Sequence, residues 1–283
     1  MKLRTLLFAP GDSPRKVTKA LGLPVDAVIL DLEDSVAAPA KESARVAAAS
    51  VLADHPDRLI VRINPAETHW YLGDLGAVVP RRPAAIMLPK CSSPDDLRTL
   101  ARQLDVLEVA FDLPRGKIGV LPLATETAAS LRNMDYAGVT PRLRALAFGA
   151  EDLSADLGVT PRGPDGSYAA PVEAARAALL VAAAAAGVPA VDTPWPDPRD
   201  LDGLAREARG AVRDGFAGKL CIHPDQIGPV AVAFTPTPER LAWARSVREL
   251  FASSTGSGVL TLNGKMIDRP HLRLAERLLA AGD

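Results

Sequence analysis

The sequence predicts an α/β protein with a (β/α)8 TIM-barrel fold and a C-terminal helical extension. Eight short apolar runs recur along the chain, each ends in polar, glycine or proline residues, and helical stretches lie between them. The runs are continuous rather than alternating, as in strands of a parallel sheet that is buried on both faces. A doubly wound sheet is the alternative. The absence of GxGxxG after the first run and the count of eight favour the barrel.

The predicted strands can be placed from these apolar runs alone. They cover residues 3–9, 27–32, 59–63, 84–88, 118–123, 143–148, 188–191 and 220–222. The clearest helices between them are expected at residues 42–52, 95–104 and 172–186. The last of these stops at Gly187, a residue type that commonly follows a helix C-terminus, and a proline comes shortly after.

The chain length predicts one large domain followed by a short extension. With 283 residues, the chain is somewhat longer than the roughly 250 residues of a typical eightfold barrel. We expect the barrel in residues 1–235 and the extension in residues 236–283. The extension contains a helical stretch at 239–251, a flexible turn at 253–258, a strand-like piece at 259–262 and a final helix.

Composition argues against several classes of partner. The net charge of −1 gives no general attraction to nucleic acid or to an anionic membrane. Cys91 and Cys221 have neither CxxC nor metal-ligand spacing, which is typical of a protein from a reducing cytoplasm. The apolar stretch at the N-terminus is too short for a signal-peptide core, so a cytoplasmic location is expected.

Two carboxylates follow neighbouring strands of the predicted barrel. Glu126 follows the fifth strand and Asp152 follows the sixth. Barrel active sites lie at the C-terminal ends of the strands, so these side chains are expected to converge. Two carboxylates with water suit Mg²⁺, which retains water or substrate oxygens in its coordination shell. The alternative is that both residues only cap local turns or helices.

Arg62 stands inside an apolar run, where a guanidinium requires a partner. One interpretation is that it binds a substrate carboxylate through two parallel hydrogen bonds. The other is an internal ion pair with Glu33 or Asp34 at the end of the second strand. The acidic group Asp31, Glu33 and Asp34 could orient Arg62 or support metal-bound water.

Two further segments carry polar groups of interest. The loop at residues 11–16 offers backbone amides, a helix start and the cations Arg15 and Lys16, which together suit a phosphate. The alternative is a proline-initiated helix with surface cations. His223 ends the eighth strand without a ligand cluster around it, which favours a structural role. No GxSxG segment supports serine hydrolysis.

Seven motifs in order, together with a C-terminal segment, resemble the citrate lyase beta-subunit family, which includes malyl-CoA and citramalyl-CoA lyases. The similarity covers nearly the whole chain. The motifs lie at residues 6–16, 30–34, 61–65, 88–90, 125–127, 148–153 and 222–224, and the C-terminal segment at residues 263–271.

The resemblance implies a Mg²⁺-dependent barrel enzyme with defined residue roles. The metal ligands correspond to Glu126 and Asp152, with Glu126 also at the substrate. Arg62 corresponds to the arginine that binds the substrate carboxylate. Asp268 corresponds to an acid/base that reaches a neighbouring subunit's site, which implies a homotrimer or hexamer. Arg15 and Lys16 are expected to hold the CoA phosphates.

The implied reaction is carbon–carbon cleavage of a citryl, malyl or citramalyl thioester. It would give a keto acid such as oxaloacetate and an acyl thioester on CoA or an acyl-carrier protein. One alternative is a class II aldolase acting on free hydroxy-keto acids. Another is a dependent subunit that works with citrate lyase alpha and acyl-carrier subunits. The sequence departs from the family pattern at residues 128–130, Ala-Ala-Ser, where a glycine is usual.

Overall fold

The computed structural model describes residues 2–55, 58–254 and 258–282. The chain divides into two compact units, Met1–Val230 and Ala231–Asp283. The division falls inside helix α8 (Ile227–Phe234), and the predicted division after residue 235 follows the end of that helix. Part of the turn expected at 253–258 lies outside the described residues.

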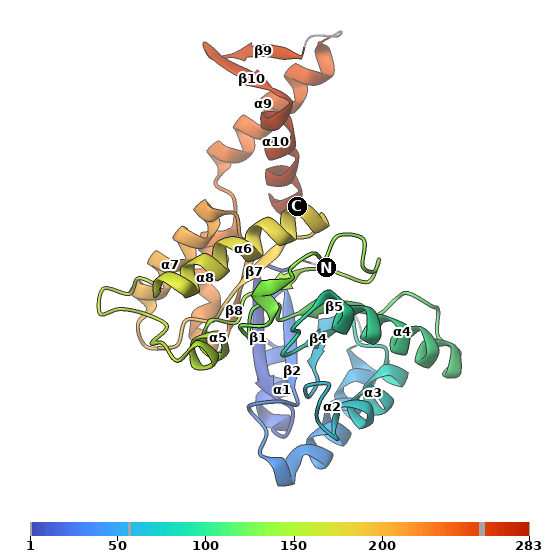
Figure 1. The fold of residues 1–283 in the computed structure, drawn as a ribbon. Helices are drawn as coiled ribbons and strands as arrows, with labels where there is room; N and C mark the ends of the chain where they lie inside the picture. The colour runs from blue at the N-terminus through green and yellow to red at the C-terminus, as the bar shows by residue number, and fades with distance from the viewer. Residues whose placement is uncertain (1, 56–57, 255–257, 283) are drawn as a thin grey trace. The chain divides into compact units, whose positions relative to one another are not determined.

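The first unit is built on eight parallel strands (Figure 1). Seven successive pairings give the order β5-β4-β3-β2-β1-β8-β7-β6. Strands that are consecutive in the sequence therefore lie side by side in the sheet from β1 to β5. Every predicted strand is present, with ends shifted by a few residues. The strands are β1 (Thr5–Pro10), β2 (Ala27–Asp31), β3 (Leu59–Arg62), β4 (Ala85–Leu88), β5 (Gly119–Pro122), β6 (Leu146–Ala147), β7 (Ala190–Asp192) and β8 (Gly218–Cys221).

Backbone hydrogen bonds between β5 and the segment around β6 close the sheet into a barrel. The amide of Val120 donates to the carbonyl oxygen of Arg142 at 2.8 Å, and the amide of Arg144 donates to that of Val120 at 2.9 Å. The amide of Ala124 donates to the carbonyl oxygen of Ala147 at 3.0 Å. Because only Leu146–Ala147 form a regular strand here, this seam has less regular pairing than the rest of the barrel. The predicted (β/α)8 architecture is confirmed.

The barrel interior is filled by inward-facing side chains of both small and large size. The cluster includes four alanines, and such a mix of small and large side chains is typical of a packed barrel interior. Leucine, isoleucine, valine and methionine fill the remaining space. The cluster comprises Leu3, Leu6, Ala27, Ile29, Ile60, Ala85, Met87, Leu121, Leu123, Ala145, Ala147, Val191 and Leu220.

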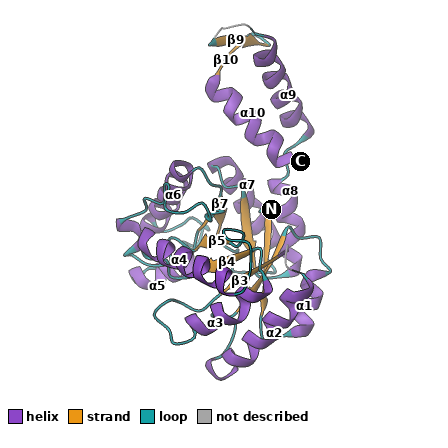
Figure 2. Cartoon of the chain, turned by 90° about the vertical axis from the view of Figure 1, so that its right-hand side faces the viewer, coloured by secondary structure: helices purple, strands orange, loops and turns teal. Residues whose placement is uncertain are grey.

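Helices surround the strands of the first unit (Figure 2). The structure contains the expected helices and others that the apolar pattern did not reveal, including one from Tyr71, one from Leu201 and one from Ile227. Helix α6 (Ala170–Ala186) is followed by Gly187, whose φ of 70° fits the predicted left-handed C-terminal position. The helices before α8 are α1 (Pro14–Leu21), α2 (Lys41–Asp54), α3 (Tyr71–Val78), α4 (Pro94–Ala110), α5 (Ala150–Leu157), α6 (Ala170–Ala186) and α7 (Leu201–Asp214). No described helix is long and apolar enough to cross a membrane.

A buried ionic cluster joins β7 and β8 to the helices outside them. The ammonium of Lys219, a fully buried residue, donates to Asp192 at 2.7 Å and to Glu207 on α7 at 2.5 Å. Arg176 on α6 donates to Asp214 at 2.7 Å and lies over the ring of Phe216. Each buried charge therefore has an opposite partner, as burial requires.

The second unit is a helical hairpin that carries a small antiparallel sheet. It contains α9 (Pro238–Ser253), β9 (Val259–Leu262), β10 (Lys265–Asp268) and α10 (Arg269–Gly282). Ala244 and Val247 of α9 pack with Ile267 and Ala275 in its core. The predicted strand and both predicted helices are present. The strand β10 was not predicted, although Asn263-Gly264 is a typical two-residue hairpin turn and both residues have positive φ.

We predict that Gly218→Ala destabilises the barrel. A Cβ at Gly218 would lie 1.6 Å from the carbonyl oxygen of Leu3, so the backbone of β8 or of the segment before β1 must shift. We expect the free energy of unfolding to fall by about 1–3 kcal/mol or more. The measurement is urea denaturation of the purified variant.

Gly210→Ala is the matched control, because Gly210 lies within α7 and its Cβ would meet no atom within 4 Å. Alanine is the better helix former, so this variant should gain about 0.5–1 kcal/mol. Equal effects of the two substitutions would contradict the tight packing at Gly218.

Candidate active site

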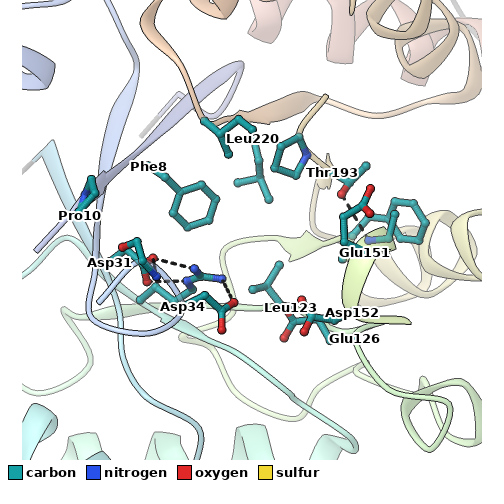
Figure 3. Close-up of a pocket in the computed structure, with 17 residues that line it drawn as sticks. Phe8, Pro10, Asp31, Asp34, Leu123, Glu126, Glu151, Asp152, Thr193 and Leu220 are labelled. Atoms are coloured by element: carbon teal, nitrogen blue, oxygen red, sulfur yellow. Dashed lines mark hydrogen bonds and ion pairs between the residues drawn. The ribbon is translucent and has the colours of Figure 1, made fainter. Parts of the chain in front are cut away.

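A pocket of about 390 Å³ opens at the C-terminal ends of the barrel strands (Figure 3). Its lining comes from strands on both sides of the barrel and from the loops that follow them. This end is where barrel enzymes place their active sites. The lining residues are Phe8, Pro10, Asp31, Asp34, Ser35, Arg62, Leu123, Glu126, Phe148, Gly149, Ala150, Glu151, Asp152, Thr193, Pro194, Leu220 and Ile222.

Arg62 is fixed on one side of this pocket by a carboxylate from the neighbouring strand. Its Nε and Nη2 each donate to an oxygen of Asp31 at 2.7 Å, a bidentate arrangement. Nη1 lies 3.0 Å from Glu33 and 3.4 Å from Asp34. The ring of Phe8 lies 4.8 Å from the guanidinium carbon. The internal ion pair proposed for Arg62 is therefore present, with Asp31 as the main partner.

Glu126 and Asp152 both line this pocket and both contact Lys90, which follows β4. The backbone amide of Lys90 donates to Glu126 at 2.5 Å. The Lys90 ammonium forms an ion pair with Asp152 and lies 3.6 Å from Glu33. The predicted convergence of the two carboxylates is thus found. Glu126 does not cap a helix, and Asp152 lies in the first turn of α5, which begins after Gly149.

Three carboxyl groups, those of Glu33, Glu126 and Asp152, surround the single ammonium group of Lys90. Burial raises the pKa of Glu126 to about 8 and that of Glu33 to about 7. Burial alone would lower the pKa of Lys90, but the surrounding carboxylates raise it above its ordinary value. The pKa of Asp31 is lowered instead. Burial alone would raise it, but the hydrogen bonds and the positive charge of Arg62 outweigh burial.

Local backbone geometry sets the positions of these groups. A Cβ on Gly149 would lie 2.5 Å from Cγ of Glu126, so only glycine fits beside this carboxylate. The amide of Gly149 donates to the hydroxyl of Thr125 at 3.0 Å, which links the ends of β5 and β6. Lys90 adopts a positive φ of 50°, an uncommon conformation for a residue with a side chain. Such conformations are concentrated at functional sites.

The chemistry of these side chains fits a hard divalent cation. Carboxylate oxygens are the ligands that Mg²⁺ prefers, usually one or two from the protein with water or substrate completing the shell. Oε2 of the buried Glu33 makes no hydrogen bond among the described residues, and its one close charged neighbour there is Nη1 of Arg62 at 3.0 Å. In the same residues, no group of three or more His, Cys, Asp and Glu side chains is arranged to hold a metal. The site therefore fits a two-carboxylate magnesium centre rather than an all-protein cage.

The remaining predicted residues do not line this pocket. Arg15 and Lys16 lie on the exposed first turn of α1. Asp268 ends β10 in the second unit, where Nδ1 of His271 lies 2.5 Å from its carboxylate. Nδ1 of His223 accepts a hydrogen bond from the amide of Asp225 at 3.2 Å, which caps the short helix at Pro224–Gln226.

Two lysines at the site were not predicted from the sequence. Lys90 lies just after the end of β4, a position where catalytic groups are common, but its side-chain type gave no indication of its role. Lys41 on α2 is buried, and its ammonium donates to the carbonyl oxygens of Leu32 and Glu33 at 2.8 and 2.7 Å. It holds the acidic loop after β2 in place. Its position in a helix gave no indication of this contact.

Comparison with known families agrees with this geometry. Residues 4–224 match the model of the HpcH/HpaI aldolase/citrate lyase family. The chain therefore belongs to this family, whose citrate lyase and citramalyl-CoA lyase members are carbon–carbon lyases, and the predicted class of enzyme is confirmed.

Individual relatives resemble the chain over nearly its full length. Mitochondrial citramalyl-CoA lyase of Rattus norvegicus is 33% identical over 292 residues, covering 98% of this chain and 85% of the relative. The crystal structure of protein CitE from Mycobacterium tuberculosis with magnesium, acetoacetate and coenzyme A is 37% identical, with a TM-score of 0.78. That similarity covers 99% of this chain and 98% of the other.

A second structure from M. tuberculosis, a citrate lyase beta subunit with oxaloacetate and magnesium, is 36% identical with a TM-score of 0.70. It covers 83% of this chain and 98% of the other. Both of these relatives contain magnesium together with a small keto acid. The predicted magnesium cofactor is thereby confirmed for this type of enzyme.

We predict that the metal-free protein loses stability as the pH rises from about 4.5 to about 8. The folded pKa of Glu126 is about 8, against an ordinary value of 4.5, so the folded state holds a proton that the unfolded chain has lost. The free energy of unfolding then falls with pH by up to about 1.4 kcal/mol per unit for each such group. Glu126→Gln should flatten this decline in urea denaturation with EDTA.

The exposed Glu151, which lines the same pocket, provides the control. Glu151→Gln should leave the pH dependence as in the unsubstituted protein. Parallel curves for the Glu126 variant and the unsubstituted protein would show that Glu126 titrates normally.

Proposed function

We propose that this protein is a Mg²⁺-dependent lyase that cleaves a 3-hydroxyacyl thioester, of the citryl, malyl or citramalyl type, into a keto acid and an acyl thioester. One observation carries the proposal: the buried Glu126, whose pKa burial raises to about 8, and the adjacent Asp152 share a pocket with Arg62. The relatives with magnesium and small keto acids support the same assignment.

In this proposal Glu126 and Asp152 hold the magnesium ion. When bound, the ion supplies a Lewis acid for the hydroxyl and carboxylate oxygens of the substrate. The Lys90 ammonium, which now pairs with Asp152, must release that carboxylate. Lys90 then remains near Glu33 and offsets its charge. Glu126 keeps the hydrogen bond from the Lys90 amide, which fixes its direction.

Arg62 is proposed to bind the carboxylate of the keto-acid portion. Asp31 occupies Nε and Nη2, so this pair serves to orient the guanidinium. Nη1 makes the longer contacts, at 3.0 Å to Glu33 and 3.4 Å to Asp34, and is the group that can exchange them for a substrate oxygen. A charged donor in a water-poor pocket stabilises negative charge in the transition state.

Asp268 is proposed as the acid that protonates the thioester enolate after the carbon–carbon bond opens. In the condensation direction it would remove the same proton. His271 beside it can stabilise the carboxylate. We further propose that Asp268 serves the site of a neighbouring copy in a homotrimer or hexamer, and that the enzyme is cytoplasmic. Arg15 and Lys16 are proposed to bind phosphates of CoA.

The decisive experiment removes each proposed metal ligand. Glu126→Ala and Asp152→Ala should each reduce Mg²⁺-dependent cleavage of malyl-, citramalyl- or citryl-CoA by at least about 100-fold, equivalent to about 2.7 kcal/mol of transition-state stabilisation. They should also weaken Mg²⁺ binding in calorimetry. Glu151→Ala, in the same pocket, should leave both properties within about twofold. Intact metal affinity and turnover in the first two variants would refute the assignment.

The same assays separate the two alternative functions. A class II aldolase would cleave free hydroxy-keto acids and ignore every CoA ester. A dependent citrate lyase subunit would be inactive alone and would need alpha and acyl-carrier subunits. The proposed enzyme cleaves a CoA ester without a partner protein.

We predict that Asp268→Asn separates binding from chemistry. The variant should lose at least about 100-fold in thioester cleavage, because it has no proton to give at this position. Binding of Mg²⁺ and of pyruvate or oxaloacetate should be retained, because Glu126, Asp152 and Arg62 are unchanged. Equal turnover of the variant and the unsubstituted protein would contradict the acid role.

A further inference from the structure

We infer that the N-terminal end of the barrel contains a second site, for a multiply charged phosphorylated small molecule with an apolar body. A cavity of about 820 Å³ lies there. It is lined by residues that precede or begin the strands, whereas the candidate active site is lined by residues that end or follow them. The two pockets therefore lie at opposite ends of the strands. The lining residues are Leu3, Arg82, Pro83, Ala84, Glu108, Leu113, Pro114, Lys117, Ile118, Arg144 and Pro189.

Three cations without acidic partners line this cavity. Arg82 precedes β4, Lys117 precedes β5 and Arg144 precedes β6. All three side chains are exposed, and within the part of the chain that the structure describes none forms an ion pair. Three uncompensated positive charges around one cavity attract a polyanion more strongly than a single charge does.

The one acidic side chain of the lining does not cancel these charges. Glu108 is fully buried, and its carboxylate accepts hydrogen bonds from the amides of Gly116 at 2.6 Å and Ile118 at 3.0 Å. Arg142 donates to the same carboxylate from within the protein. Glu108 and Arg142 thus neutralise each other, and the cavity keeps a net positive charge.

The floor of the cavity is apolar. Leu3 and Ile118 are buried at the base of the barrel, and Pro83, Pro114 and Pro189 stand beside them in the lining. Rigid prolines lose little entropy on contact with a ligand. The combination of an apolar floor and a few charged groups is typical of a small-molecule site rather than of a bare ionic patch.

The side chain of Arg144 packs against the backbone of Gly119, which begins β5. A Cβ on Gly119 would lie 2.5 Å from Cγ and 2.9 Å from Nε of Arg144, so this side chain packs across the first residue of β5. Arg82 has a positive φ of 56°, which is uncommon outside glycine and asparagine and costs conformational energy. In this conformation Arg82 ends the short helix over Val79–Arg81, just before β4.

These features specify the class of ligand. Three cations match an anion with two or more charges, such as a diphosphate, and arginine is suited to planar or tetrahedral oxyanions. The cavity of about 820 Å³ lies within the range for a drug-sized ligand with a non-charged body. We therefore assign it to the nucleoside diphosphate class, with the phosphates at the cations and the base on the prolines.

The test measures binding of ADP and of inorganic pyrophosphate by calorimetry, with EDTA present so that the proposed magnesium centre does not contribute. We expect Lys117→Gln combined with Arg144→Gln to weaken ADP binding by at least about tenfold. ADP should bind several times more tightly than pyrophosphate. Its affinity should fall as the ionic strength rises to about 0.15 M, where the screening length is about 8 Å.

Two further double variants make the outcome decisive. Arg206→Gln with Arg209→Gln removes two exposed cations of α7 that form no ion pair among the described residues, and it should change the affinity by less than about twofold. Arg15→Gln with Lys16→Gln tests the loop proposed for CoA phosphates and should also leave ADP binding unchanged.

Three results would overturn the inference. The first is that ADP does not bind at millimolar concentration. The second is that the α7 variant loses as much ADP affinity as the Lys117 and Arg144 variant. The third is that only the Arg15 and Lys16 variant loses ADP affinity. Equal affinity for ADP and pyrophosphate would refute the apolar part of the site. Because turnover is not measured, failure of the lyase proposal would leave these results unaffected.

Discussion

The balance of charge around Lys90 is the constraint on which the candidate active site depends. Glu33 and Glu126 are buried, and Asp152 stands beside them; the Lys90 ammonium contacts Glu33 and Asp152, and the Lys90 backbone amide donates to Glu126. Burial alone would protonate such carboxylates, as the raised pKa values of Glu33 and Glu126 indicate. A divalent cation relieves this cost, so the pocket is built to gain stability from the metal that it needs.

The barrel makes this arrangement possible because parallel strands bring residues distant in sequence to one rim. Lys90, Glu126 and Asp152 follow β4, β5 and β6, and Arg62 ends β3. The Asp31–Arg62 pair adds a fixed cation on the other side of the pocket. A glycine at position 149 then allows the β6 end to approach Glu126 closely. The order of the strands sets which groups meet, and the loop conformations set the distances.

Much of this organisation could be predicted from the sequence. All eight strands were identified, because strands buried on both faces form continuous apolar runs that sequence alone reveals. Their ends were less certain: the sixth run covers residues 143–148, but only Leu146–Ala147 pair regularly, since tertiary context decides where pairing stops. Glu126, Asp152 and Arg62 were located because they interrupt or end apolar runs. Lys41 could not be located, because its contact with Leu32 and Glu33 depends on how α2 packs.

The same strands connect the two ends of the barrel. β4, β5 and β6 begin at the cavity lined by Arg82, Lys117 and Arg144 and lead to Lys90, Glu126 and Asp152. Between β5 and β6 the pairing consists of isolated bridges, so this seam is the part of the sheet with the fewest regular hydrogen bonds. An anion held by Lys117 and Arg144 would join the two sides of that seam.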